Sequence, residues 1–429
     1  MGKPSDHWTS FQELDRQSLH SQKIDLVLKN ANFVHLCSIA SQARLSNDNL
    51  HNDGGSSQCL QCSIDPSEFS AGYNNVVFEV AFSDSSQWVA RVRLPENGAS
   101  KRDHIETAML SEIATLRIVA SKTTIPVPTI YHFNVDASND FGFRYILMQA
   151  LPGRRPQSGL ARSVPEEHMD KITDQLAGYY HQLSRLHFDR IGRLWCGRSA
   201  QEQPSIIPVR KVGGPFSTSL EYFYVLRKSD NRSIQSKHAG DKEWMTAAWI
   251  LEQALPSMIV ENFIHGPFPL CHIDLHYNNI LIDEDFNITG IIDWSDSQTV
   301  PLERFLTTPE FTTFPGLSVE QNAPIVVFRE KFAAALKKRE RGDDLPDDKS
   351  GNESNEKVPT APVHAPPRFI SDIIGTPLWE IVFRCTYSYP WRAKTDAALV
   401  LRQIFGGSVT WEDLVQYRDS GPMSRLGRF

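Results

Sequence analysis

The sequence is poor in cysteine, has no long hydrophobic run and shows no excess of basic residues. Its 429 residues include 6 cysteines, too few and too scattered for a disulfide framework, so we expect reduced thiols in a cytoplasmic protein. Cys59 and Cys62 form a lone C-x-x-C pair, which without a second pair argues against a zinc site. No segment reaches the roughly 18 apolar residues of a membrane span, and the opening MGKPSDHWTS lacks the apolar core of a signal peptide. We therefore expect no membrane partner.

Charge and length narrow the class further. Lys and Arg total 44 against 51 Asp and Glu, a formal net charge of −7, so we expect no nucleic-acid partner. Hydrophobic residues make up 40% of the chain, which is enough for buried cores and excludes wholesale disorder. A chain of 429 residues exceeds one compact domain, and we expect two lobes.

Changes in composition along the chain suggest its organisation. The patterns predict a helical N-terminal extension over residues 1–45, a first lobe over 46–150 and a mostly helical second lobe over 151–429. In the first lobe, the runs NVVFEVAF and QWVARVRL predict a β-hairpin, and the turn LPGRRP marks the end of the lobe. Residues of about 340–367 are charged and proline-rich with almost no large apolar side chains, so we expect a disordered insertion there.

The segment FPLCHIDLHYNNILIDEDFNITGIIDW contains the most informative motif. It reads His272-x-Asp274, then Asn279 after four residues, and Asp293 follows a second apolar run. About one chain in twenty of this length would contain the first three positions by chance, so they alone are a moderate signal. One alternative is a polar turn that caps a buried hairpin. Another is a hydrolase metal site that includes His276, but the sequence shows no second His/Asp cluster at hydrolase spacing.

The runs ILID and ITGIID predict two strands joined by the turn EDFN. In a hairpin symmetric about this turn, residue 279 lies opposite residue 292, so Asn279 and Asp293 lie at the same open end. A carboxylate and an amide oxygen there can share a hard cation such as Mg²⁺. Asp274, on the preceding loop, can accept a hydroxyl proton. These three groups are the minimum set for phosphoryl transfer from ATP.

An ion pair is predicted in the first lobe. Arg91 lies in the strand WVARV, and Glu112 lies among apolar neighbours on a helix predicted over residues 104–120. An acid on an apolar stripe is costly unless it is paired, so a pair of Arg91 with Glu112 would satisfy both groups. The alternative is a solvated Glu112 at the edge of the stripe. Arg93 competes with Arg91 for this role, but we expect it on the opposite face of the strand.

Four acidic residues suggest a weaker hypothesis about the acceptor. They could line a pocket for a cationic substrate, whereas most acids are simply solvated surface residues. The four are Asp296, Glu303, Glu310 and Glu380.

From about residue 59 to 320, the chain resembles the aminoglycoside phosphotransferase family and especially its fungal members. The resemblance rests on GYNNVVFEV, WVARV, SEIATLRIV with TTIPVP, YILMQALPG, HIDLHYNN and IIDW. It implies a two-lobed, protein-kinase-like α+β fold with a small antiparallel sheet in the N-lobe and a mainly helical C-lobe. It also implies transfer of the γ-phosphate of ATP, with Mg²⁺, to a hydroxyl of a small-molecule acceptor.

Carried over residue by residue, the resemblance implies roles for the second-lobe motif. Asp274 would be the catalytic base, and His272 would orient its loop. Asn279 and Asp293 would bind Mg²⁺. Ile273 stands where protein kinases have the arginine of H-R-D, and IIDW replaces D-F-G.

The resemblance also implies a nucleotide site in the first lobe. Arg91, paired with Glu112, would hold the ATP phosphates at a position where the family has Lys or Arg. Gly72 would lie in the turn over the phosphates, although SAGYNN is not G-x-G-x-x-G and by itself predicts only a turn. Backbone groups from Gln149 to Leu151 would contact the adenine.

Two departures from the kinase pattern bear on the reaction. Pro309 of a Thr-Pro-Glu triplet lies only sixteen positions after Asp293, which leaves little room for an activation loop and favours a small-molecule kinase over a protein kinase. Arg91 in place of Lys, together with the poor glycine loop, favours a different alternative, a catalytically weak pseudokinase-like binding module. The sequence leaves the acceptor and the oligomeric state open.

Overall fold

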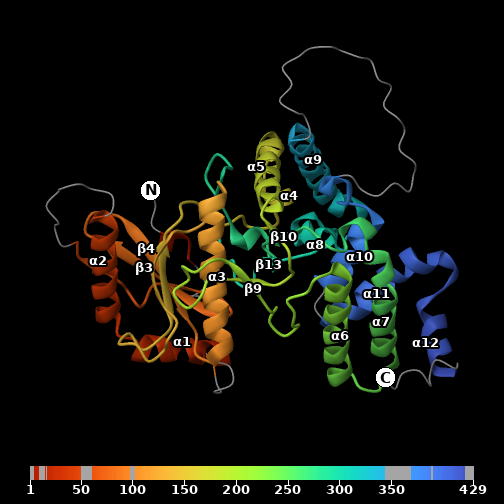
Figure 1. Cartoon of the computed structure of the whole chain (residues 1–429), viewed down its shortest axis with the longest axis horizontal. Helices are drawn as coiled ribbons and strands as arrows, with labels where there is room; N and C mark the ends of the chain where they lie inside the picture. The colour runs from red at the N-terminus through yellow and green to blue at the C-terminus, as the bar shows by residue number, and fades with distance from the viewer. Residues whose placement is uncertain are drawn as a thin grey trace, which may run out of the picture. The chain divides into compact units, whose positions relative to one another are not determined.

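The structure is a computed structural model that describes residues 4–8, 15, 17–49, 60–96, 102–343, 369–387 and 390–420 (Figure 1). Its elements form two compact units, each of which collects separate stretches of the chain. The first unit comprises residues 1–156, 195–205 and 278–295, and the second comprises 157–194, 206–277 and 296–429. Across the described ranges, no helix is long and apolar enough to cross a membrane. Cys59 and the predicted insertion at 340–367 lie outside the described residues, except that 340–343 end a helix.

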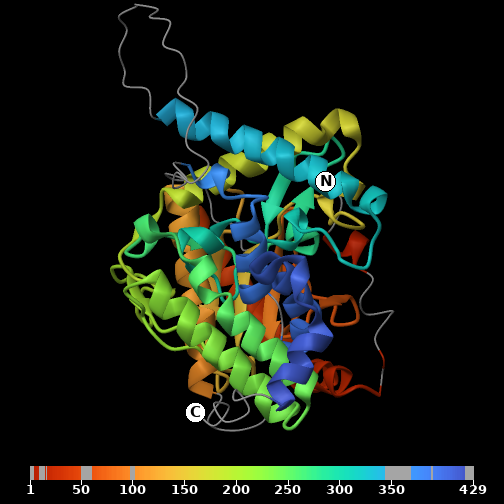
Figure 2. The same ribbon diagram turned by 90° about the vertical axis from the view of Figure 1, so that its right-hand side faces the viewer.

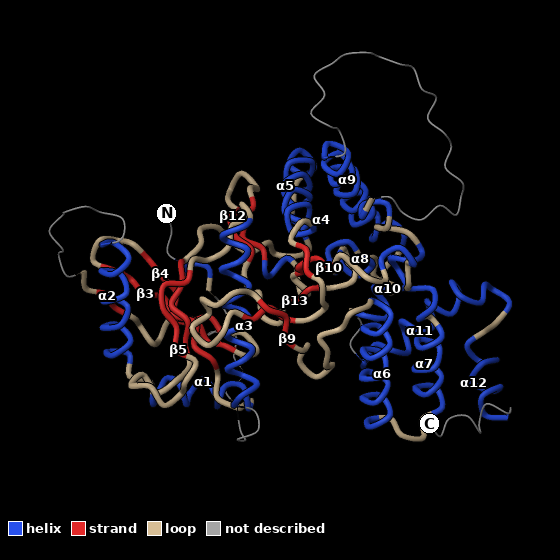
Figure 3. The backbone as a smooth tube through the Cα atoms, in the orientation of Figure 1, coloured by secondary structure: helices blue, strands red, loops and turns tan. Residues whose placement is uncertain are grey.

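A six-stranded antiparallel sheet forms the centre of the first unit (Figure 3). The strand order is β1-β3-β4-β6-β5, and β2 also pairs with β3. The predicted hairpin is confirmed, because every second residue of β3 and β4 is buried and Val77 pairs with Arg91. The strands are β1 (Cys62–Ser63), β2 (Phe69–Ala71), β3 (Asn75–Phe82), β4 (Gln87–Arg93), β5 (Ile130–Asn134) and β6 (Tyr145–Gln149).

Helices cover both faces of this sheet. The predicted N-terminal helical segment contains two helices, α1 (Leu19–Asn30) and α2 (Phe33–Asn49), which share a hydrophobic core with Phe78 and its neighbours. On the other face, α3 (Arg102–Lys122) packs against the side chains of β4, β5 and β6 that point away from that core. Alternation along β4 therefore directs Arg91 to the face that α3 covers.

The hairpin of β11 (Ile280–Ile282) and β12 (Ile288–Ile291) belongs to the first unit, although it follows the boundary expected near residue 150. Backbone hydrogen bonds give the reason. Arg154 and Ile282 exchange two such bonds, each of 2.9 Å, which attach the hairpin to the chain just after β6. A short hairpin belongs to the unit with which its backbone groups form hydrogen bonds, even when the rest of that unit lies far away in the sequence.

The second unit is mainly helical, and Figure 2 turns its helices toward the viewer. Four helices (α6, α7, α10 and α11) surround one buried core, while α5, α8 and α9 meet through Tyr180, Phe305 and Phe332. A three-stranded sheet has the order β13-β10-β7, and β8 pairs with β9. The helices are α4 (Leu160–Ser163), α5 (Glu166–Ser184), α6 (Ser219–Lys237), α7 (Lys242–Gln253), α8 (Leu302–Phe305), α9 (Val319–Asp343), α10 (Pro377–Thr386), α11 (Ala393–Phe405) and α12 (Trp411–Ser420). The remaining strands are β7 (His187–Phe188), β8 (Arg193–Trp195), β9 (Ser205–Ile207), β10 (Phe268–Cys271) and β13 (Gln298–Thr299).

Candidate active site

The open end of the β11–β12 hairpin brings Asn279 and Asp293 to the same place, as the sequence predicts. Ile280 pairs with Ile291. One step beyond this pair, the amide of Ile292 donates to the carbonyl of Asn279 at 3.0 Å. Asn279 is buried, whereas 48% of the Asp293 side chain is exposed. Asp293 also has a φ of 58°, a left-handed conformation that is uncommon outside glycine and is often found at functional sites.

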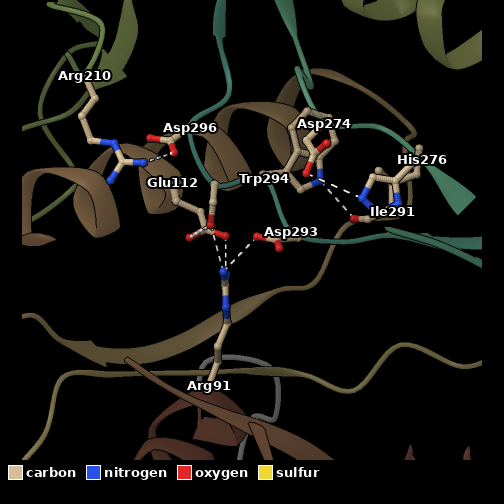
Figure 4. A network of polar contacts seen from close by, with 10 residues as sticks. Arg91, Glu112, Arg210, Asp274, His276, Ile291, Asp293, Trp294 and Asp296 are labelled. Carbon is tan, nitrogen blue, oxygen red and sulfur yellow. Dashed lines mark hydrogen bonds and ion pairs between the residues drawn. The ribbon is translucent and has the colours of Figure 1, made fainter. Parts of the chain in front are cut away.

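Arg91 is the centre of a polar network in the first unit (Figure 4). Its Nη1 donates to Oε1 of Glu112, so the predicted ion pair is confirmed. Its Nη2 lies 2.9 Å from Oδ1 of Asp293 and 2.9 Å from Oγ of Ser295. The Ser295 hydroxyl donates in turn to Oε2 of Glu112 at 3.0 Å. In the orientation of the Asn75 side-chain amide that gives both its nitrogen and its oxygen a partner, the oxygen accepts hydrogen bonds from Nε and Nη2 of Arg91 at 3.2 and 2.9 Å.

The network holds one positive and two negative charges when all three groups are ionised. Burial raises the pKa of Glu112, and the neighbouring Arg91 guanidinium opposes that rise. Burial acts in the opposite sense on Arg91, but Glu112 and Asp293 together raise its pKa, so the guanidinium stays charged. The excess negative charge lies at the half-exposed Asp293 carboxylate, which favours a cation there.

The same end of the hairpin fits the chemistry of a magnesium ligand set. Asn279 and Asp293 carry an amide oxygen and carboxylate oxygens, which are the donors that Mg²⁺ prefers. Two protein ligands are typical for Mg²⁺ when substrate phosphates and water complete its shell. The metal role of both residues remains a prediction.

The expectation for Arg93 is wrong. Side chains alternate along a strand with a period of two, so residues 91 and 93 share a face. Both lie among the half-buried positions of β4, and Arg93 pairs with Glu96 at 3.2 Å. The two arginines thus differ in their partners and not in the face they occupy.

The other predicted nucleotide residues lie at strand ends of the first unit. Gly72 begins the turn from β2 to β3, and its amide donates to the carbonyl of Asn75 at 2.9 Å, so the predicted tight turn is confirmed. Gln149 is the last residue of β6 and pairs with Trp88. The chain then leaves the sheet, and Leu151 belongs to no strand. Contacts of these residues with a nucleotide remain predictions.

Asp274 lies in the second unit, on the loop that runs from His272 to Tyr277, here called the H-x-D loop. Its Oδ1 accepts a hydrogen bond from the Tyr387 hydroxyl at 2.9 Å, and its Oδ2 lies 3.6 Å from Nε2 of His276. Although burial opposes the change, His276, Tyr387 and His272 together lower the pKa of Asp274. A carboxylate that stays ionised can accept a proton, as the predicted base must.

Two residues that follow α8 hold the H-x-D loop in place. The Thr308 hydroxyl donates to the carbonyl of Leu275. The buried carboxylate of Glu310 accepts from the amide of Tyr277 at 2.8 Å and from the amide of Leu160 at 2.7 Å. The Thr-Pro-Glu triplet is the only sequence signal for this role. Because the triplet lies far from the H-x-D motif in the sequence, the sequence alone did not indicate that the two are in contact.

The acceptor pocket predicted from four acids is not supported. One of them, Glu310, holds the H-x-D loop in place, as described above. Glu303 is fully buried, and its Oε1 accepts from a backbone amide at 3.0 Å. Asp296 pairs with Arg210 at 3.0 Å, and Glu380 pairs with Arg384 at 2.7 Å (Figure 4 shows the first pair). Each of the four acids thus has a partner within the protein, so these contacts do not support the pocket, which stays a prediction.

Comparison with known proteins identifies the family. The model of the phosphotransferase enzyme family matches residues 65–302, more than half of the 429 residues. The chain belongs to the phosphotransferase enzyme family. The match includes the predicted catalytic, nucleotide-binding and metal-binding residues, from Gly72 to Asp293.

Curated relatives are fungal and match over parts of their length. A subtelomeric hrmA-associated cluster protein of Aspergillus fumigatus is 27% identical over 131 residues, which is 30% of this chain and 25% of that protein. Clavilactone A biosynthesis cluster protein Y of Ampulloclitocybe clavipes is 26% identical over 241 residues, 51% of this chain and 57% of that protein. The chain therefore spans about a quarter of the first relative and little more than half of the second.

Solved structures with which the chain aligns include phosphotransferases and kinases. Plasmodium vivax ethanolamine kinase is 13% identical with a TM-score of 0.45, and the match covers 97% of this chain and 98% of the kinase. An aminoglycoside phosphotransferase in ternary complex with streptomycin and ATP is 13% identical with a TM-score of 0.42, covering 82% and 93% of the two chains. The predicted antiparallel sheet in the N-terminal part and the mainly helical C-terminal part are confirmed by the elements of the described residues.

Proposed function

We propose that this phosphotransferase moves the γ-phosphoryl group of ATP to a hydroxyl group of a small molecule. The Arg91 network is the observation that carries the proposal. It joins a buried ion pair with Glu112 to the half-exposed Asp293, and it lies in a chain of the phosphotransferase family. If the pair of Arg91 with Glu112 had only a structural role, it would not need a second carboxylate. Asp293 is such a second carboxylate, and it lies on strained backbone at the end of a hairpin.

Each residue has a role in this reaction. Glu112 and Asn75 hold the Arg91 guanidinium, which would bind phosphate oxygens. Asp274 accepts the proton of the acceptor hydroxyl while the oxygen of that hydroxyl forms a bond to the γ-phosphorus. The bond between that phosphorus and the bridging oxygen breaks, and ADP leaves with the bond electrons.

Asn279 and Asp293 would hold Mg²⁺, which would neutralise charge on the phosphate groups when bound. This assignment agrees with the excess negative charge of the network. Gly72 and the segment from Gln149 to Leu151 would contact the phosphates and the adenine, respectively. These assignments extend the family match to individual residues.

One observation favours a second candidate, a nucleotide-binding module without efficient catalysis. Arg91 already contacts Asp293 through Nη2, so it competes with a metal ion for that carboxylate. An arginine fork also occupies more space than the lysine ammonium found at this position in many kinases. A module of this kind would bind ATP with little dependence on Mg²⁺.

The test measures ADP formation by the purified chain with ATP, Mg²⁺ and a panel of polyols, amino alcohols and amino sugars. Asp274→Asn keeps the shape of the side chain and removes the base, so we expect turnover to fall about 100- to 10,000-fold. Asp140→Asn is the matched control, because this side chain is 86% exposed, and it should leave turnover unchanged.

The two candidates give different results. Turnover that depends on an acceptor and on Mg²⁺, and that is lost in Asp274→Asn, supports the phosphotransferase. Thermal stabilisation by ATP that is equal with and without Mg²⁺, with no turnover of any acceptor, favours the binding module. Equal turnover in Asp274→Asn and the native protein would contradict the assigned base.

A further inference from the structure

Three aromatic rings are aligned along α10 in the second unit. Trp379, Phe383 and Tyr387 follow one another at intervals of four residues and so lie on one face of the helix. The rings of Trp379 and Phe383 stack with centroids 6.0 Å apart, and those of Phe383 and Tyr387 stack at 5.1 Å. The amide of Tyr387 donates to the carbonyl of Phe383 at 2.9 Å, so this residue continues the last helical turn.

The far end of this aromatic column is anchored in the core. Trp379 is fully buried, and its indole nitrogen donates to the carbonyl of Leu306 at 3.1 Å. The guanidinium of Arg329 lies over the same ring at 5.4 Å. Buried Arg384 braces the helix through ion pairs with Glu380 at 2.7 Å and Asp396 at 3.4 Å. The position of Tyr387 is therefore set by a packed and hydrogen-bonded helix.

The column ends at the H-x-D loop. The Tyr387 hydroxyl donates to Oδ1 of Asp274 at 2.9 Å, while His276 lies near Oδ2 at 3.6 Å. Tyr387 thus holds one oxygen of the Asp274 carboxylate from the end of α10, and His276 of the H-x-D loop lies beside the other oxygen. Contacts from two different elements restrict rotation of the carboxylate more than a contact from one element alone.

We propose that Tyr387 is the positioning residue for the base Asp274, and that its hydroxyl holds the carboxylate in the orientation that receives the acceptor proton. The inference rests on the proposed function and adds a residue to it. A carboxylate offers about four acceptor positions, so the tyrosine can stay in place while the acceptor hydroxyl binds. Tyr387 lies beyond residues 65–302, and the family match therefore does not supply this role.

The contact has a consequence for the pH dependence of activity. The groups that lower the pKa of Asp274 are His276 and His272, both on the H-x-D loop, and Tyr387, which continues α10. Removal of the tyrosine hydroxyl takes away one interaction that favours the ionised carboxylate, so the pKa of Asp274 rises. Since the base works only when ionised, the acid limb of the pH–rate profile should move to higher pH.

The test compares Tyr387→Phe with the native protein. Phenylalanine keeps the stacked ring and removes only the hydroxyl, so the fold should be kept and the melting temperature should fall by only a few degrees. We expect kcat to fall about tenfold, the KM for ATP to stay within about twofold, and the acid limb to move to higher pH. Tyr224→Phe is the matched control, because this tyrosine is 45% exposed on α6, and it should change none of these quantities.

A second measurement does not depend on turnover. In protein labelled with ¹³C at the aspartate carboxyl groups, NMR titration follows Asp274, whose signal is identified by its loss in Asp274→Asn. A higher titration midpoint for Asp274 in Tyr387→Phe supports the inference about Tyr387. If the protein also turns over no acceptor, that result contradicts the proposed function and leaves the inference about Tyr387 standing. An unchanged midpoint, or active protein with unchanged kcat and pH profile, overturns the role of Tyr387 and leaves the proposed function standing.

Discussion

Removal of the Arg91 side chain tests how the first-unit network is held together. The substitution Arg91→Met keeps an unbranched side chain on β4 and removes the guanidinium. It leaves Glu112 without its ion-pair partner, although Ser295 still donates a hydrogen bond to it. The variant therefore has a buried carboxylate with no cation bonded to it.

The structure sets the expected size of the effect. Glu112 is 5% exposed, and loss of one partner from a buried pair costs about 3–5 kcal/mol of unfolding free energy. Asp293 is 48% exposed, so water solvates its charge and it adds little to the loss. We expect about 3 kcal/mol for Arg91→Met. The double variant Arg91→Met/Glu112→Met leaves no buried charge, and we expect a loss below about 1.5 kcal/mol.

The effect should depend on pH. Burial raises the pKa of Glu112, and without Arg91 that pKa rises further. A carboxyl group whose pKa is raised in the folded state costs stability as the pH rises through that range, because the folded state then holds the extra proton. The deficit of Arg91→Met should therefore be smaller near pH 5 than near pH 8.

The assay is urea unfolding, with hydrogen exchange of peptides from β4 and α3 as a local measure in a chain of two units. Arg154→Met is the matched control, because its pair with Glu284 is 3.6 Å long and 35% and 89% exposed, and it should cost less than about 1 kcal/mol. A loss in Arg91→Met no larger than in this control would refute the reasoning. So would a double variant less stable than Arg91→Met.

Two further predictions concern titratable groups elsewhere, namely two cysteine thiols and one carboxyl group. The hydrogen bond with Cys37 lowers the pKa of Cys62 to about 7, whereas burial raises that of Cys271 to about 12. Among the cysteines that the structure describes, iodoacetamide at neutral pH should therefore label Cys62 before Cys271, as read by peptide mass spectrometry, and the reverse order would contradict this. Burial also raises the pKa of Glu303 from its usual 4.5 to about 7, so stability should fall as the pH rises between these values. Glu303→Gln should flatten that slope in urea unfolding, by up to about 3 kcal/mol, and an unchanged slope would show that Glu303 does not titrate in this range.

Features set by neighbouring residues were predicted well from the sequence. Alternating apolar residues identified the hairpin of β3 and β4, and the turn EDFN led to the pairing that places Asn279 opposite residue 292. The pair of Arg91 with Glu112 followed from the cost of an unpaired acid on an apolar stripe. In each case a short-range pattern or a single unfavourable burial carried enough information.

Partners that are far apart in the sequence were not predicted. Asn75 and Ser295 join the Arg91 network, yet nothing in their local sequence distinguishes them from turn residues. Glu310 was interpreted as an acceptor-binding acid, whereas its burial and two backbone bonds make it a support of the H-x-D loop. Small polar residues are common on surfaces, and only a folded chain shows which of them are enclosed.

The sequence by itself determined the local chemistry of this protein: the H-x-D motif, the oxygen donors at one end of a hairpin and the alternation that puts Arg91 on one face of a strand. The tertiary structure alone decided which distant groups meet these residues. It assigned the β11–β12 hairpin to the first unit through the bonds of Arg154, and it brought Tyr387 from α10 to Asp274. The physical reason is that backbone periodicity acts over a few residues, whereas hydrogen bonds and packing depend on distance in space, to which separation along the chain is a poor guide.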